Sequence, residues 1–323
     1  MITRQNQLFR VFFYTLLLVV TFDVEAQHLY QQPKPLFEKS TLDEIIGQDH
    51  LDGNYNEKLK ILWVYGYDEH HIAGAHDYVK VKDLMNGLLS TVSNVEVDEA
   101  FEFPSEQQFH ENDVIVMFLH LPQLKKKHFD LLQNFIEKGG GVVCLHETVI
   151  MRPSSKGNNL ANCLGFAWNE GKSKWGAIFD EITIDNQHPI FKRFNTRLTI
   201  NDEFYWDLFQ ESEGVNILGS VRTGPAGESV APLPKDRLSL GASPVFWTYQ
   251  IGKGKVFGTT TGHHTFTYYD PEFRIILFRS IAWVANRKPG PLMPLVFKGI
   301  TKEDGMVGIT ENLRYWEGKK RPQ

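Results

Sequence analysis

Residues 139–148 read Gly-Gly-Gly-Val-Val-Cys-Leu-His-Glu-Thr. The three glycines allow a turn that other side chains would hinder. The apolar, β-branched run after them is typical of a strand buried on both faces of a parallel sheet. The run ends by placing His146 and Glu147 side by side. Because open α/β sheets bind ligands beyond the carboxyl ends of their strands, this titratable pair marks a candidate site.

Strand and helix patterns alternate around this stretch. Apolar strands are expected at 60–66, 95–97 and 113–120, with amphipathic helices after the first and third of them. This alternation predicts an α/β fold in which helices flank a parallel sheet. Further along, Gly252-Lys253-Gly254 separates two apolar runs and predicts an added hairpin, and a last helix is expected from residue 271.

Histidines lie at or just after the ends of the predicted strands, where such folds keep their sites. They are His76, His120, His146 and His263. Neutral imidazoles suit Zn²⁺ or a similar divalent ion, and carboxylates from Glu147, Asp202 or Glu203 would complete its set of three or four ligands. Since a shared ion needs nitrogen–metal bonds of ~2 Å, this hypothesis requires His76, His146 and His263 to meet.

Other interpretations of these residues stay open. A metal-free site, with His146 and Glu147 as acid and base, fits the same sequence. His76 beside Asp77 also fits a simple helix cap, and His120 fits a strand end bonded to backbone. Asp202-Glu203 fits a solvated loop pair equally well.

The cysteines do not favour thiol chemistry. There are two, Cys144 and Cys163. A nucleophile elbow places its reactive residue on the turn after a strand, whereas Cys144 lies inside the strand and His146 takes roughly the elbow position. Buried structural thiols are expected at both positions, in preference to a disulfide.

The net charge and the N-terminal segment limit the expected location of the protein and the kinds of partner it binds. The 323 residues carry a net charge of −5 without a basic stripe, so nucleic acid is not an expected partner. Residues 1–26 have a basic start, an apolar run of about 12 residues and a small-residue end, which predicts a signal peptide and a secreted or periplasmic protein. An uncleaved anchor is the alternative, and no membrane insertion is expected after cleavage. An arm at 27–58, a domain at 59–287 and a polar tail at 288–323 complete the predicted organisation.

The whole set of motifs resembles the ThuA-like family, named for a trehalose-utilisation protein. The residues that carry the resemblance run from His76-Asp77, through 139–146 and His188-Pro189-Ile190, to Asp202-Glu203 with Tyr205, 244–247, 252–257 and Gly262-His263. The family has a flavodoxin-like sheet similar to that of class I glutamine amidotransferases. Some family positions differ in this chain: Glu147 replaces a common serine, and histidines are missing near Trp168 and at Ser243.

The resemblance implies carbohydrate metabolism without naming a reaction. We expect an enzyme acting on a glycoside or keto-sugar, with His146, Glu147, His263 and Glu203 in the site. Tyr205, Trp175 and Asp202 are the expected contacts to a small-molecule sugar, since aromatic rings offer apolar faces to sugar rings. A non-catalytic sugar-binding or accessory module is the alternative, and a cysteine-dependent amidotransferase-like enzyme ranks last. The sequence does not predict the oligomeric state.

Overall fold

The structure is a computed structural model. It describes residues 36–47, 54–69, 71, 73–150, 157–178, 181–210, 214–223, 229–230, 243–303 and 305–308. The predicted signal peptide and most of the Pro- and Gly-rich segment between residues 224 and 242 lie outside these ranges. Within them, no helix is both long and apolar enough to cross a membrane.

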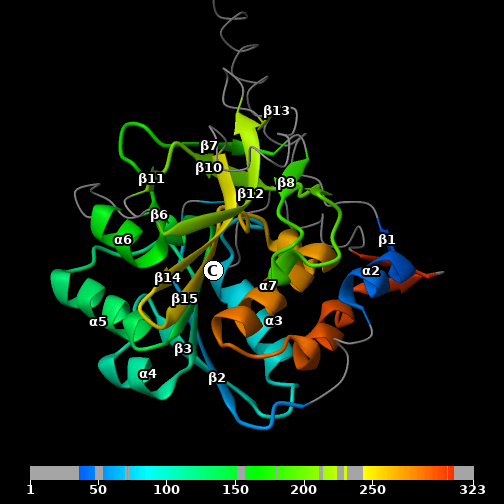
Figure 1. Cartoon of the computed structure of the whole chain (residues 1–323), viewed down its shortest axis with the longest axis horizontal. Helices are drawn as coiled ribbons and strands as arrows, with labels where there is room; N and C mark the ends of the chain where they lie inside the picture. The colour runs from blue at the N-terminus through cyan, green and yellow to red at the C-terminus, as the bar shows by residue number, and fades with distance from the viewer. Residues whose placement is uncertain are drawn as a thin grey trace, which may run out of the picture. The chain divides into compact units, whose positions relative to one another are not determined.

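A ten-stranded sheet in the order β3-β2-β4-β5-β15-β14-β12-β8-β9, with β13 beside β12, forms the centre of the fold (Figure 1). The strands are β2 (Leu59–Tyr65), β3 (Val95–Phe101), β4 (Val114–Phe118), β5 (Gly141–Leu145), β8 (Ile182–Ile184), β9 (Arg197–Leu198), β12 (Val215–Thr223), β13 (Ser229–Val230), β14 (Ser243–Ile251) and β15 (Gly254–Thr259). From β3 to β15 the strands pair in parallel, and from β15 to β9 they pair antiparallel. The predicted parallel sheet and the β14–β15 hairpin are both confirmed.

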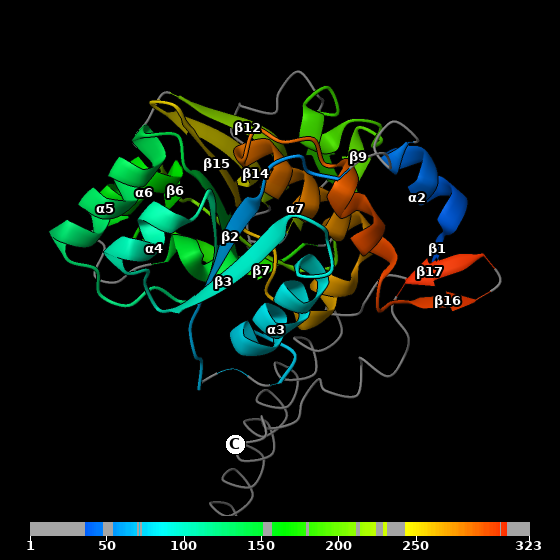
Figure 2. The ribbon, with the colours of Figure 1, turned by 90° about the horizontal axis from the view of Figure 1, so that it is seen from below.

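Helices cover both faces of this sheet (Figure 2). One face carries α4 (Glu106–Glu111), α5 (Lys126–Glu137) and α6 (Gly157–Leu164), and the other carries α3 (Tyr78–Leu89) and α7 (Pro271–Val284). Strand β2 shows why: Ile61 and Trp63 enter the core shared with α3 and α7, whereas Leu62 and Val64 enter the core shared with α5 and α6. The run Ile61–Val64 is apolar at every position and is thereby buried on both sides of the sheet.

The glycine run before β5 is required by close packing. Gly139 has a φ of +116°, which residues with a side chain rarely adopt. A Cβ at Gly141 would lie 2.8 Å from Val284 of α7. The run therefore lets the chain turn and lets β5 start directly against the last helix.

The segments at the two ends of the domain pack onto it more closely than predicted. Strand β1 (Phe37–Glu38) pairs with β17 (Met306–Gly308), which pairs with β16 (Thr301–Glu303). Helix α2 (Lys39–Ile46) and the 3₁₀ helix η7 (Gly290–Phe297) bury apolar side chains in the α7 core. Within the predicted polar tail, residues 290–297 are thus an apolar segment that is buried against the domain.

A separate two-stranded ribbon, β7 (Lys174–Ala177) with β10 (Glu203–Trp206), lies beyond the main sheet (Figure 1). A second short pair, β6 (Phe166–Ala167) with β11 (Phe209–Gln210), flanks it in sequence. Successive residues of a strand point to opposite faces, so Glu203 and Tyr205 share one face of the ribbon. Trp175 pairs directly with Tyr205 and lies on that same face.

Candidate functional site

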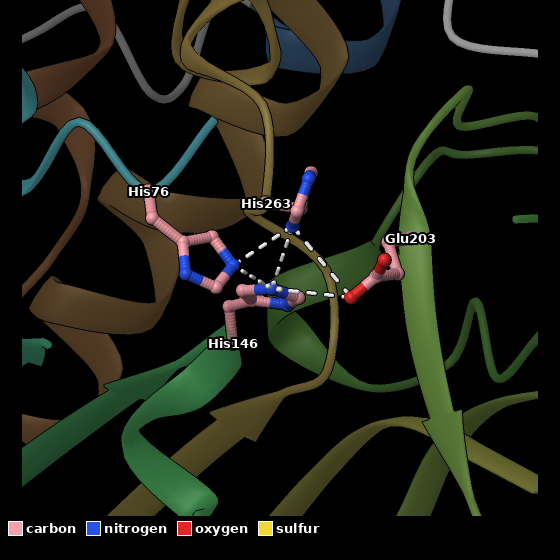
Figure 3. Close-up of side chains that lie close together, drawn as sticks. All are labelled: His76, His146, Glu203 and His263. Carbon is pink, nitrogen blue, oxygen red and sulfur yellow. Dashed lines mark hydrogen bonds and ion pairs between the residues drawn. The ribbon is translucent and has the colours of Figure 1, made fainter. Parts of the chain in front are cut away.

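Three histidines from distant parts of the chain meet at the carboxyl edge of the parallel strands (Figure 3). His76 Nε2 lies 2.8 Å from His263 Nδ1 and 3.1 Å from His146 Nε2, and the last two nitrogens are 3.2 Å apart. Glu203 Oε1 lies 3.7 Å from His146 Nε2 and 3.6 Å from His263 Nδ1. These four residues are the ones that the sequence places at strand ends and in the Asp202-Glu203 pair.

The backbone at two of these histidines is strained. His146 directly follows β5 and His76 precedes α3, with φ values of +49° and +50°. Residues with a side chain adopt this region at a cost, and such strain accumulates at functional sites. Below His146, the hydroxyl of buried Thr148 donates to the carbonyl of Met117 and fixes the turn after β5.

Asp77 joins the loops of His76 and His263. Its Oδ2 accepts hydrogen bonds from the Gly74 N–H at 2.8 Å and from the Thr265 hydroxyl at 2.6 Å. The His76 N–H also donates to the His263 carbonyl at 3.0 Å. Asp77 is the N-cap residue of α3, but its side chain makes no capping hydrogen bond and holds the two histidine loops together.

Asp202 holds the His263 loop from the other side. Its carboxylate accepts from the Gly262 N–H at 2.8 Å and from the Thr267 hydroxyl at 2.7 Å. The side chain is buried, and burial raises its pKa to about 7 although these hydrogen bonds oppose the rise. Since its oxygens serve the loop, we revise its expected role from sugar contact to positioning residue.

The partners of His146 and His76 assign their tautomers. His146 Nδ1 lies 2.7 Å from the Thr260 carbonyl, which only accepts, so Nδ1 carries the proton and the Nε2 lone pair points inward. His76 Nδ1 lies 2.7 Å from Glu147 Oε2, which likewise leaves the Nε2 lone pair inward. Burial, reinforced by His76, lowers the pKa of His146 well below its usual value, and the neutral ring is the form that binds metals.

Glu147 is bonded to His76 and to two further side chains. Its carboxylate accepts from His76, from His120 Nδ1 at 2.8 Å and from the Tyr78 hydroxyl. Burial acts to raise the pKa of Glu147, but the hydrogen bonds from His120 and His76 outweigh burial and lower it below the usual range. In known metal sites, a carboxylate that accepts from the ring N–H of a histidine orients that histidine toward the metal.

Tyr78 is a residue of the site that the sequence pattern did not indicate. Val79 is 39% exposed, whereas Tyr78 is buried. Its position two residues after His76, at the start of the helix, is the signal that was available. His120, expected at the strand edge, contacts Glu147 Oε1 through its Nδ1 at 2.8 Å.

The four converging groups fit a divalent ion of the zinc type. Two ligands at ~2.05 Å in a tetrahedron lie about 3.3 Å apart, close to the observed nitrogen spacings. Burial, together with Asp202, raises the pKa of Glu203, and a bound cation would stabilise that buried carboxylate. His76, His146, Glu203 and His263 are all buried and offer ligand atoms within 4.8 Å of one another.

The two expected sugar platforms have different surroundings. The Tyr205 ring is buried between the His146 ring, 4.7 Å away, and the edge of Trp168, 5.6 Å away. Its hydroxyl lies 2.8 Å from His146 Nε2. Trp175 is 55% exposed and stays available as a platform. The ring of His71, whose side chain is 41% exposed, stacks 3.9 Å from that of His76.

The thiols lie away from this chemistry. Cys144 and Cys163 are free and buried, as expected. Cys144 lies within β5 with no exposed surface, and burial raises the pKa of its thiol. Since the thiolate is the nucleophilic form of cysteine, a buried environment that raises the thiol pKa disfavours cysteine catalysis.

The parallel sheet, its flanking helices and a site at the strand ends define a protein with the class I glutamine amidotransferase-like fold. A family model described as "Trehalose utilisation" matches residues 62–284, so the chain belongs to the ThuA family. A ThuA-like protein from Bacteroides uniformis is similar in structure, with a TM-score of 0.56 at 18% identity over 74% of this chain and 98% of that one. One from Parabacteroides merdae has a TM-score of 0.55 at 14% identity over 80% and 99%. The comparison with curated proteins gives no match.

Proposed function

We propose that this protein is a metal-assisted enzyme of carbohydrate breakdown that acts on a glycoside or keto-sugar. The proposal rests on one observation: His76 Nε2 and His146 Nε2 lie 3.1 Å apart, and each nitrogen directs its lone pair inward. Such lone pairs repel unless a proton or a cation lies between them. The fixed tautomers and the nearby Glu203 carboxylate favour a divalent cation.

Each residue has a defined task in this proposal. His76, His146, His263 and Glu203 hold the ion. Glu147 orients His76, and Asp77 and Asp202 hold the ligand loops. When bound, a zinc-type ion polarises a sugar carbonyl or activates water. Trp175 offers its apolar face to the sugar ring, with the polar centre on the same side of the ribbon.

The family description supports a sugar as the substrate class, and a small-molecule sugar is the partner that we propose. The basic and apolar start of the sequence supports export to the periplasm or the medium. An exported enzyme of this kind would meet disaccharides before uptake.

The test combines metal analysis with turnover. The purified protein is expected to hold about one zinc-type ion per chain and to convert at least one member of a panel of disaccharides and 3-keto-disaccharides. His146→Ala should lose both properties. His110→Ala, at an exposed position on α4, is the matched control and should keep both. Full turnover by His146→Ala would refute the proposed function.

A non-catalytic sugar-binding module is the second candidate. The observation that favours it is burial: the most exposed of the four ligand residues, Glu203 and His263, are each 7% exposed. Structural metal sites are closed in this way, whereas catalytic ones keep an open position. Tight sugar binding without turnover across the panel would establish the module.

A further inference from the structure

The Tyr205 hydroxyl is bonded to one of the proposed metal ligands. Its oxygen lies 2.8 Å from His146 Nε2. Because His146 Nδ1 donates to the Thr260 carbonyl, Nε2 can only accept, and the Tyr205 hydroxyl must be the donor. The bond lies in the protein interior, where Tyr205 is 2% exposed.

This hydrogen bond and a metal ion need the same lone pair. An ion bound to His146 Nε2 would break the hydrogen bond from the Tyr205 hydroxyl, which keeps its proton. The released hydroxyl remains beside the ion, because its ring is held by His146 on one side and Trp168 on the other. A buried hydroxyl that loses its acceptor is costly unless it finds another.

The ribbon shows where a new acceptor would come from. Tyr205 pairs with Trp175 across β10 and β7, and the Cβ atoms of such pairs lie about 4.5–5.5 Å apart, roughly the width of a sugar ring. Glu203 lies two residues away on the same face. A sugar stacked on exposed Trp175 and facing the ligands therefore brings its oxygens towards the Tyr205 hydroxyl.

We propose that Tyr205 is a catalytic residue that exchanges partners: it gives up His146 when the metal binds and then donates a hydrogen bond to a sugar oxygen at the centre. This inference rests on the metal centre of the proposed function. Tyr205 acts as a donor and not as a fifth ligand, because zinc sites draw their ligands from cysteine, histidine and carboxylates.

Zinc titration of Tyr205→Phe tests the exchange without an activity assay. The variant lacks the competing hydrogen bond, so it should bind Zn²⁺ about fivefold more tightly than wild type, the factor expected from one ordinary hydrogen bond. Zinc binding to wild type should also perturb tyrosine ultraviolet absorption without producing a tyrosinate band, and the perturbation should vanish in the variant. Tyr249→Phe, on the β14 arm of the hairpin, is the matched control and should behave as wild type.

Each other outcome has a defined meaning. Weaker zinc binding by Tyr205→Phe, or a tyrosinate band in wild type, would make Tyr205 a ligand and overturn the exchange while leaving the metal centre intact. Unchanged affinity would overturn it as well. If wild type binds no zinc, the metal centre of the proposed function fails and this inference fails with it. Thermal melting of both variants shows whether the fold is kept.

With a substrate from the panel, turnover gives a second readout. Tyr205→Phe loaded with zinc should lose at least about tenfold in kcat with KM nearly unchanged, since the donor acts on the reacting oxygen more than on sugar binding. A raised KM with unchanged kcat would reduce Tyr205 to a binding contact and contradict the catalytic role.

Discussion

The edge of the main sheet and the β7–β10 ribbon contribute to the same centre in different ways. The sheet edge supplies His76, His146 and His263 from strand ends and the loops that follow them. The ribbon supplies Glu203 and Tyr205 from a separate pair of strands. The first region provides histidine nitrogens, with the lone-pair direction fixed at His76 and His146, and the second provides oxygen groups that face them.

The difference lies in how each group is held. His146 and His76 are fixed by a carbonyl and a carboxylate at 2.7 Å, and both have strained backbones. Glu203 Oε1 lies 3.6–3.7 Å from the histidine nitrogens, beyond hydrogen-bond distance. In the proposed function, the sheet edge therefore sets the position of the ion, and the ribbon completes the centre and faces the substrate.

Removing a sheet-edge ligand should have the largest effect. His146→Ala is expected to weaken zinc binding by more than about 100-fold, the upper end of losses seen for residues that merely support a ligand. Calorimetric titration with Zn²⁺ measures this. Glu203→Ala should weaken binding less, because the three histidines remain. An equal loss in the two variants would remove the distinction between the two regions.

Removing the support of a sheet-edge ligand should come next. Glu147→Gln keeps the size of the side chain but loses the charge that orients His76, so zinc affinity should fall about 10–100-fold. Glu106→Gln, at an exposed position on α4, serves as the control. If Glu147→Gln binds zinc normally but loses turnover, Glu147 is the acid or base after all.

On the ribbon, Trp175→Ala should separate sugar binding from metal binding. The variant loses a stacking interaction worth about 1–1.5 kcal/mol, which should raise KM for the sugar roughly tenfold. Zinc affinity should stay at the wild-type value, because Trp175 is 55% exposed and is not one of the four clustered ligand residues. A weakened zinc site in this variant would show that the ribbon positions the ion as well.

His188, which is not one of the four clustered ligand residues, should affect stability alone. Its Nδ1 accepts from the Ile190 N–H, and burial lowers its pKa to about 4, although Asp185 opposes the shift. The unfolded chain has a pKa near 6.5, so it binds more protons between these values and stability falls as pH drops from about 6.5 to about 4. Because the side chain is partly exposed, we expect His188→Gln to reduce the loss of unfolding free energy between these pH values by about 1 kcal/mol.

Urea unfolding at pH 7 and pH 4 measures the effect of His188. The difference in unfolding free energy between wild type and variant should change between the two pH values, and zinc affinity at pH 7 should not. A difference that is independent of pH would mean that His188 keeps its usual pKa in the folded protein.

The sequence predicts the sheet-edge half of the centre well for a physical reason. Parallel strands end at one edge, so residues that follow apolar runs, such as His146 and His263, must come close together. The alternation of strand and helix patterns likewise predicts the parallel part of the sheet, and the Gly252-Lys253-Gly254 turn predicts the β14–β15 hairpin. The local pattern and the global fold agree in this part of the chain.

The ribbon half was less accessible to sequence reasoning. Short strands such as β7 and β10 carry little periodicity, and their pairing decides which side chains face the site. Neither the burial of Tyr205 nor the use of Asp202 as a loop anchor follows from residue type. The role of Glu147 also required the structure, since its three donors come from separate segments.

The most direct test of the metal centre is a crystal structure of the zinc-loaded protein with anomalous diffraction at the zinc edge. We predict one strong peak about 2.0–2.2 Å from His76 Nε2, His146 Nε2 and His263 Nδ1, with Glu203 beside it. The Tyr205 hydroxyl should have left His146 Nε2. A structure without that peak, in which the Tyr205–His146 hydrogen bond persists in the presence of zinc, would refute the metal centre.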